Sequence, residues 1–119
     1  MKKSDKKIDN TLRLALTEVC ETALEYVSGF QWLTHIVKLQ SFPESLLIVC
    51  VFETNLALEE AKCSGQVEDF ARLIDEKFHG VGIALKHTKQ HIRFDSEENC
   101  EKQNGGNWKA RFQSPPLKT

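Results

Sequence analysis

The sequence predicts an α+β fold in which helices cover a mostly antiparallel sheet, forming a two-layer sandwich. Three observations indicate this class. The chain contains one uninterrupted apolar run, LLIVCVF at 46–52; two stretches repeat apolar residues every three or four positions; and other stretches alternate apolar and polar residues. The expected order of elements is α-β-β-α-β-β, with a short extra helix before the last element.

The run at 46–52 is the expected centre of the sheet. Most of its residues are β-branched or aromatic, which favours a strand over a piece of buried helix. Pro43 lies just before the run, where its missing N–H costs the sheet nothing. A strand that is apolar on both faces needs a cover on both faces. Helices of this chain can supply one or both covers, and a partner subunit could supply the other.

The composition is that of an ordinary globular domain. The length of 119 residues predicts one domain over 1–119, ordered over about 5–113 with loose ends, and the net charge of −1 gives no overall field that favours nucleic acid or an anionic membrane. No apolar span reaches the length that crosses a bilayer, and MKKSDKKIDN does not lead into the apolar region of a secretory signal. We therefore expect a cytoplasmic protein.

The first half of the chain predicts one helix and two strands. A helix is expected over 5–28, ended by Gly29, and a strand over 31–39. The connection to the next strand, 46–53, is short, so the two strands should be antiparallel neighbours. The apolar stripe of the helix is formed by Ile8, Leu12, Ala15, Leu16, Val19, Ala23, Leu24 and Val27.

The second half predicts smaller elements. Thr54 and Asn55 offer an N-cap, and Ser96 can cap a short helix whose first turn is acidic, although a loop remains an alternative at 96–103. The expected elements are a helical turn or irregular loop at 56–63, a helix at 66–79, a strand at 81–86, a polar turn at 86–90, a half-exposed strand at 91–95, the short helix at 96–103 and a last strand or extended arm at 108–112.

The polar cluster at 91–98 is the first candidate site. His91, Asp95, Glu97 and Glu98 are candidate catalytic residues, because carboxylates beside a histidine can hold a divalent cation and transfer protons. One hypothesis is therefore a small metal-dependent hydrolase or nuclease. The alternative, which we prefer, is a solvated strand face that leads into an acidic helix start, since the helix dipole alone explains these acids.

Other patterns for cofactors and metals are weak. His87 and His91 are four residues apart, which is about 13 Å on an extended strand, and further ligands are not placed. The turn NGGN lacks the spacing of a phosphate-binding loop. We therefore predict no metal site, no cofactor and no small-molecule ligand.

The four cysteines form no C-x-x-C pair, so we expect free thiols. Cys20 and Cys50 should behave as small core residues. Cys63 and Cys100 lie in polar stretches and should be exposed.

Aromatic and basic residues suggest two kinds of partner. Trp32, Phe42 and Trp108 lie outside the helical stripes and are candidates for binding a protein. Lys109 and Arg111, with the N-terminal lysines 2, 3, 6 and 7 and Lys118, could form a basic patch for nucleic acid if the termini meet. The favoured hypothesis is a non-enzymatic binding or regulatory domain that acts through protein–protein contacts or self-association, for example as a homodimer.

Three segments resemble a family of small uncharacterised bacterial proteins, and together they cover nearly the whole chain. They are KKIDNTLRLALTEVCETALE, GFQWLTHIV and HIRFDSEENCEKQNGGNW. Some members of that family carry the label "Fis family transcriptional regulator", and Fis-type proteins bind DNA with a C-terminal helix-turn-helix. The resemblance implies a bacterial cytoplasmic protein and carries no established activity over to this chain.

Overall fold

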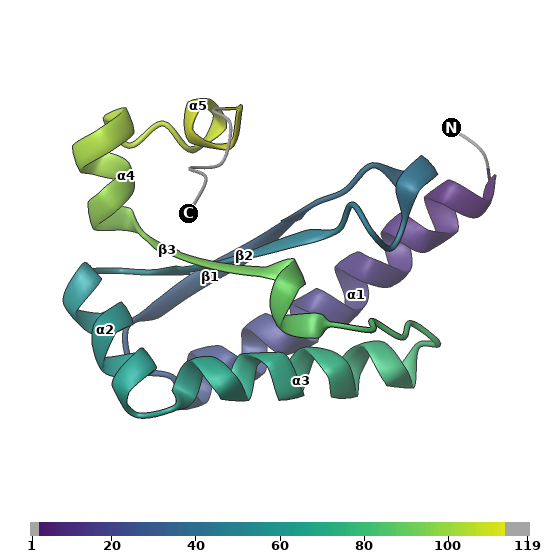
Figure 1. Cartoon of the computed structure of the whole chain (residues 1–119), viewed down its shortest axis with the longest axis horizontal. Helices are drawn as coiled ribbons and strands as arrows, with labels where there is room; N and C mark the ends of the chain where they lie inside the picture. Colours follow the sequence, from purple (N-terminus) through teal and green to yellow (C-terminus); the bar gives the residue numbers. More distant parts are fainter. Residues whose placement is uncertain (1–2, 114–119) are drawn as a thin grey trace.

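The computed structural model of the chain describes residues 3–113 and confirms the α+β class. Within this range the chain forms five α-helices, two short 3-10 helices and one three-stranded sheet (Figure 1). The elements are α1 (Lys3–Tyr26), β1 (Phe30–Ile36), η1 (Leu39–Ser41), β2 (Leu47–Phe52), α2 (Asn55–Cys63), α3 (Gln66–Gly80), η2 (Thr88–His91), β3 (Ile92–Ser96), α4 (Glu97–Asn104) and α5 (Trp108–Gln113).

Strand β2 is the middle strand of the sheet, as its apolar sequence predicts. The strand order is β1-β2-β3; β1 is antiparallel to β2, which confirms the predicted neighbours, but β3 is parallel to β2. The expectation of a mostly antiparallel sheet is therefore wrong. The reason is that α2 and α3 together form a crossover between β2 and β3, which returns the chain to the same end of the sheet.

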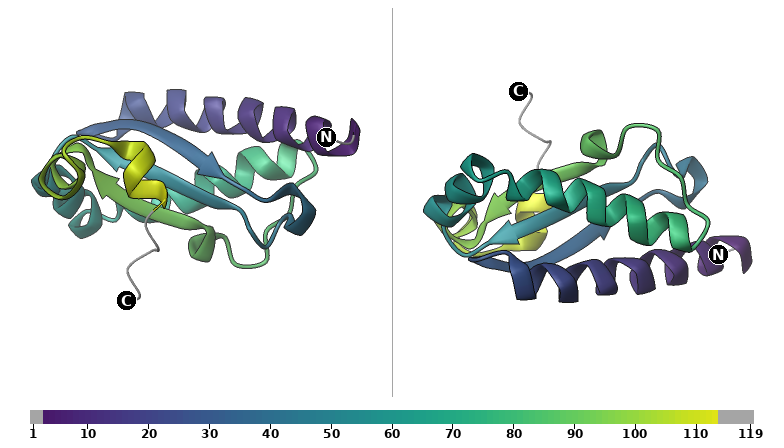
Figure 2. Two further views of the ribbon diagram at one scale, coloured as in Figure 1. Left: turned by 90° about the horizontal axis from the view of Figure 1, so that it is seen from above. Right: turned by 90° about the horizontal axis from the view of Figure 1, so that it is seen from below.

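Helices α1 and α3 lie side by side on one face of the sheet and enclose the hydrophobic core (Figures 1 and 2). Alternate residues of β2 point into this core, because side chains alternate between the faces of a strand; they are Ile48, Cys50 and Phe52. Four phenylalanine rings from β1, β2, α3 and β3 meet here at 5.1–6.5 Å between centroids, namely Phe30, Phe52, Phe70 and Phe94. The core thus joins all three strands to α3.

The other side chains of β2 point to the opposite face, and they are buried too. Val49 and Val51 are almost inaccessible, and Val51 lies in register between Trp32 of β1 and Asp95 of β3. Helix α5 lies over this face of the sheet, with α4 at its end (Figures 1 and 2). The second cover of β2 therefore comes, at the carboxyl end of the strand, from the C-terminal part of the described chain.

The strand predicted at 81–86 is not formed. This segment is a loop in which the Ile83 N–H donates to the Phe78 carbonyl oxygen, 2.8 Å away, so that the chain folds back on the end of α3. Ile83 and Leu85 then pack against the core from outside the sheet. The position beside β2 belongs to β3, which leaves this apolar segment no strand to pair with.

Two further segments are more regular than predicted. Residues 55–63 form helix α2, whose N-cap Thr54 accepts a hydrogen bond from the Ala57 N–H at 3.0 Å. Residues 108–113 form helix α5 in place of the predicted strand or arm, because the Asn107 side chain accepts from the Ala110 N–H at 3.0 Å and starts a helical turn. The alternation of apolar residues over 108–112 was a misleading signal.

Two side chains lie in other surroundings than predicted. Leu24 belongs to the predicted apolar stripe of α1 but is 51% exposed, so this part of the prediction is wrong. The other apolar residues of that stripe are buried or packed against the core. Cys100 was expected to be exposed and is buried, because α4 turns this side of an otherwise polar helix inward. Cys50 is in the core and Cys63 is exposed, as predicted.

Gly29 ends the turn after α1 and requires glycine for two reasons. Its φ of +83° lies in the left-handed region, and a Cβ added there would be 2.5 Å from the Ala57 Cβ of α2. Gly65 has nearly the same φ, +82°, but nothing lies within 4 Å of its added Cβ. A comparison of Gly29 with Gly65 therefore separates the energetic cost of the left-handed backbone from the cost of the steric clash.

We expect Gly29→Ala to lower the free energy of unfolding more than Gly65→Ala does. The Gly65 variant should lose about 1–2 kcal/mol from backbone strain alone, and the Gly29 variant about 1–3 kcal/mol more from the forced shift of α2. Urea denaturation of both variants measures the difference. Equal losses would mean that α2 moves away from Gly29 at no cost.

Candidate functional site

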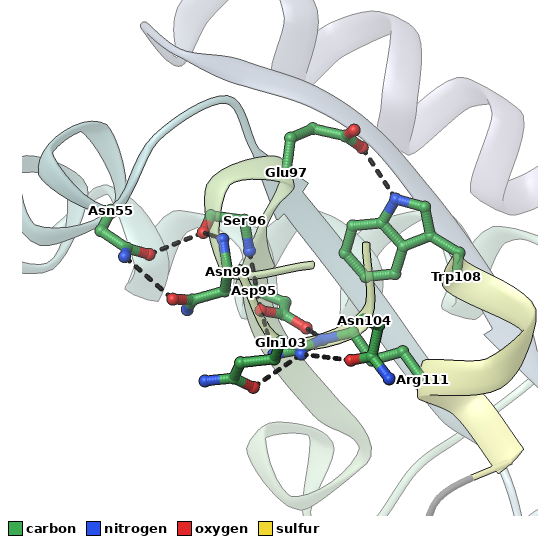
Figure 3. A network of polar contacts seen from close by, with 9 residues as sticks. All are labelled: Asn55, Asp95, Ser96, Glu97, Asn99, Gln103, Asn104, Trp108 and Arg111. Carbon is green, nitrogen blue, oxygen red and sulfur yellow. Dashed lines mark hydrogen bonds and ion pairs between the residues drawn. The ribbon is translucent and has the colours of Figure 1, made fainter. Parts of the chain in front are cut away.

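Three of the four polar residues predicted as a site, Asp95, Glu97 and Glu98, lie where β3 ends and α4 begins. Figure 3 shows Asp95 and Glu97 there with their partners. Ser96 is the last residue of β3 and the N-cap of α4, and its Oγ accepts from the Asn99 N–H at 3.0 Å. The same hydroxyl donates to Asn55 Oδ1 of α2 at 2.6 Å. A single buried serine therefore links the ends of three elements.

Asp95 forms an ion pair with Arg111 of α5. Arg111 Nε lies 2.6 Å from Asp95 Oδ2, and its second terminal nitrogen lies 3.0 Å from Oδ1, so the contact is bidentate. Both side chains are only 18% exposed. The guanidinium also donates to Gln103 and Asn104 side-chain oxygens of α4, at 2.7 and 2.9 Å. Both oxygens of Asp95 are thus used within the molecule, which is the geometry of a strong structural pair.

Glu97 holds both tryptophans of the chain. Its Oε1 accepts from the indole N–H of Trp32 at 2.8 Å and from that of Trp108 at 3.1 Å. The two rings contact edge to face, with centroids 4.9 Å apart and planes at 82°. This cluster joins β1, α4 and α5 through one carboxylate oxygen.

Glu98 joins the N-terminal ends of two helices. Its Oε1 accepts from the Asn55 N–H of α2 at 2.9 Å, and its other oxygen lies 3.2 Å from the Lys102 ammonium. The hydrogen bond from Asn55 and the charge of Lys102 hold the pKa of Glu98 below its usual range. The Asn55 side chain in turn donates to Asn99 Oδ1 at 2.9 Å. Glu98 therefore caps α2 from outside that helix.

The candidate acid–base residues do not converge. Asp95, Glu97 and Glu98 point to three different sets of partners, and His91 lies at the other end of β3, with Nδ1 2.8 Å from the Leu46 carbonyl oxygen. Among residues 3–113, no group of three or more His, Cys, Asp or Glu side chains is arranged to hold a metal. A cation at Asp95 would have to displace Arg111 first.

The aromatic candidates for binding have internal contacts. Trp32 and Trp108 contact each other, and Phe42 packs against the hydrophobic core. Trp108 also packs beside Phe112, with centroids 5.5 Å apart. All three candidates remain partly accessible, but their positions are explained by the fold itself.

The basic candidates are spread apart. Lys109 is exposed on α5, whereas the described N-terminal lysines lie at the start of α1, at the far end of the molecule (Figures 1 and 2). Lys2 and Lys118 lie outside the described residues. Helices α4 and α5 follow each other across the turn at 105–107, but α5 has six residues and its Arg111 is ion-paired with Asp95. That arginine is not available to a phosphate group.

The buried thiols are poor nucleophiles. Burial raises the pKa of both Cys50 and Cys100 above the ordinary thiol value, which keeps them protonated at neutral pH. Cys50 lies in the core against α1 and α3, and Cys100 lies on the inner side of α4. Neither thiol supplies chemistry to the cluster of Asp95, Glu97 and Glu98.

Comparison with known proteins adds no assignment: the chain matches no family model, no curated protein and no solved structure. Over residues 3–113, no helix is both long and apolar enough to cross a membrane.

Asp95, Glu97 and Glu98 lie together because they are close in the sequence, whereas their partners come from distant elements. The sequence marks Asn55 only as a possible cap of its own helix, but in the structure it bonds Ser96, Glu98 and Asn99. Arg111, a candidate for nucleic-acid binding, has Asp95 as its partner. The one available signal was the excess of acids at 95–98 with a single arginine downstream.

We expect Glu97→Ala to loosen the tryptophan cluster. It removes two hydrogen bonds to a charged acceptor, so the free energy of unfolding should fall by about 2 kcal/mol, and tryptophan emission should shift to longer wavelength as both indoles gain water. Glu97→Gln keeps an acceptor oxygen and should shift less. Because the chain has only these two tryptophans, fluorescence reports on this cluster alone; an unchanged spectrum in Glu97→Ala would contradict the arrangement.

We expect Glu98 to make stability depend on pH under acidic conditions. Since its folded-state pKa is lowered below the unfolded value of about 4.3, its contribution is complete above that value and is lost as the pH falls through the folded-state pKa. Glu98→Gln should therefore be less stable than the parent near neutral pH, and the gap should close as the pH falls. Urea midpoints measured across this range test it; a gap that does not change with pH would refute the assignment.

Proposed function

We propose that this chain is a non-enzymatic protein-binding domain that binds its partner through the outer edge of β1. The supporting observation is a difference between the two edges of the sheet. Strand order places β1 at one edge and β3 at the other, and no described segment pairs with the outer side of β1. An unpaired edge offers a row of N–H and C=O groups on which an extended segment can add a strand.

The two edges carry different protection. β3 has five residues, and two of them, Arg93 and Asp95, are charged. β1 has seven residues, FQWLTHI, with no Asp, Glu, Lys or Arg among them. Proteins commonly guard an edge by keeping it short and placing charges along it. By this measure β3 is guarded and β1 is not, which favours β1 as the edge that has a partner.

The side chains of β1 suit strand addition. Trp32, Thr34 and Ile36 point to the face opposite α1 and α3, because they pair in register with Val51, Val49 and Leu47 of β2. Ile36 is 39% exposed and lies at the open end of this row. An added strand would place its alternate side chains beside these three residues.

The internal contacts of the acidic residues at the start of α4 also support a binding role. Asp95, Glu97 and Glu98 are occupied by Arg111, by the two tryptophans and by the start of α2. The carboxylates that a metal-dependent hydrolase would use are instead hydrogen-bonded or ion-paired within the molecule. Binding at the edge of β1 requires no change in these contacts.

We expect Ile36→Lys to abolish partner binding and Val81→Lys to leave it intact. Ile36 and Val81 are similarly exposed, at 39% and 43%, but Val81 lies in the loop after α3 and outside the sheet. Each protein would be immobilised at equal density and exposed to lysate of the source organism, with retained proteins identified by mass. The expected result is a protein retained by the parent and by Val81→Lys but lost from Ile36→Lys. Retention of the same proteins by all three would contradict the proposal.

A further inference from the structure

The free edge of β1 also indicates what its partner is. Resting on the proposed function, we infer that a second copy of this chain occupies the edge, with the two β1 strands antiparallel about a two-fold axis at Thr34. This pairing is supported by the register of β1, by the side chains that this register brings together, and by the flank of α1 beside the same edge.

The regular part of β1 is centred on Thr34. The pairing of β1 with β2 is irregular between Phe30 and Trp32, and it is continuous from Trp32 to Ile36. A β-bulge disrupts the ladder on its strand, so the regular segment is the part best suited to a new partner. An antiparallel pair that uses this whole segment in both copies must be symmetric about its middle residue, which is Thr34.

This register places favourable pairs across the axis. Trp32 lies opposite Ile36 of the partner subunit, and the same pair recurs on the other side of the axis. Thr34 lies opposite Thr34 of the partner subunit. Aromatic with β-branched residues and threonine with threonine are pairs that stabilise antiparallel strands. The segment is therefore complementary to itself, as an isologous two-fold interface requires.

Helix α1 adds surface beside the same edge. Asp9 of α1 lies 3.5 Å from His35 of β1, so this side of the helix faces the strand. Further along the same side, at helical spacing, Thr17 and Leu24 are exposed. Two strands alone bury less than a typical stable interface of about 1,600 Å². The flanks of the two α1 helices would approach each other near the axis, where Arg13 and Thr17 are exposed, and would add polar contact surface to the paired strands. Leu24 lies about 22 Å from Asp9 along the helix and stays outside this contact.

Cysteine cross-linking tests the register directly. Thr34→Cys, made together with Cys63→Ser to remove the exposed native thiol, should form a disulfide between copies, because opposed residues of antiparallel strands lie within the Cα separation of about 4.4–6.8 Å that a disulfide needs. Arg93→Cys in the same background is the matched control. Thr34 and Arg93 flank Val49 on opposite sides in the sheet, so they differ chiefly in which edge they occupy.

The expected result is a dimer of the parent chain in analytical ultracentrifugation and covalent dimer from Thr34→Cys at least about 10-fold faster than from Arg93→Cys under oxidised glutathione. Ile36→Lys should weaken dimerisation by about 10-fold or more, while Val81→Lys should not. The weakening of about 10-fold by Ile36→Lys corresponds to the loss of the two Trp32–Ile36 pairs.

Two outcomes would overturn the inference. A monomer at every concentration, with Thr34→Cys cross-linking no faster than Arg93→Cys, would exclude the second copy. If Ile36→Lys then still lost a captured protein of different mass, the binding role of β1 would stand with another partner. If it lost none, the proposed function would fall as well. A dimer that Ile36→Lys leaves intact would place the interface elsewhere and also exclude this arrangement.

Discussion

The burial of β2 on both faces is the constraint on which the rest of the structure depends. Ile48, Cys50 and Phe52 need an apolar cover on one side, and Val49 and Val51 need one on the other. Helices α1 and α3 meet the first need with conventional amphipathic stripes. The second need falls to α4 and α5, which contain few large apolar residues, and this difference explains why one face is sealed by packing and the other by polar contacts.

Helix α5 is too short to be stable by itself. Six residues make fewer than two turns, and an isolated helix of that length does not persist in water. Its position depends on the ion pair of Arg111 with Asp95 and on the shared contact of Trp108 with Glu97. A half-buried charge pair is tolerated when its remaining hydrogen-bonding groups are satisfied. Gln103 and Asn104 satisfy them here, so acids that resemble a catalytic cluster in the sequence act as a fastening.

Local signals in the sequence predicted the elements that local physics determines. The apolar run of β2, the stripes of α1 and α3, and the serine cap of α4 each depend on residues close in the chain. The segment 81–86 and helix α5 were predicted wrongly because their states depend on distant partners. The first has strand-like residues but no vacant place beside β2, and the second has strand-like alternation but is captured as a helix against Trp32. The ion pair of Asp95 with Arg111 spans 16 residues and has no local signature.

The crossover from β2 to β3 determines which strands would lie at the edges of an assembly formed through β1. Because α2 and α3 carry the chain to the far side of β2, the short charged strand β3 becomes one edge and the uncharged β1 the other. Pairing two β1 strands about a two-fold axis would consume both unguarded edges at once. The resulting six-stranded sheet would have β3 at each end, where length and charge oppose further addition. The unprotected edge of β1 would favour open-ended aggregation if it stayed unpaired. In the dimer both β1 edges are paired, so assembly would stop at two copies, and β1 would need no charged residues to protect it.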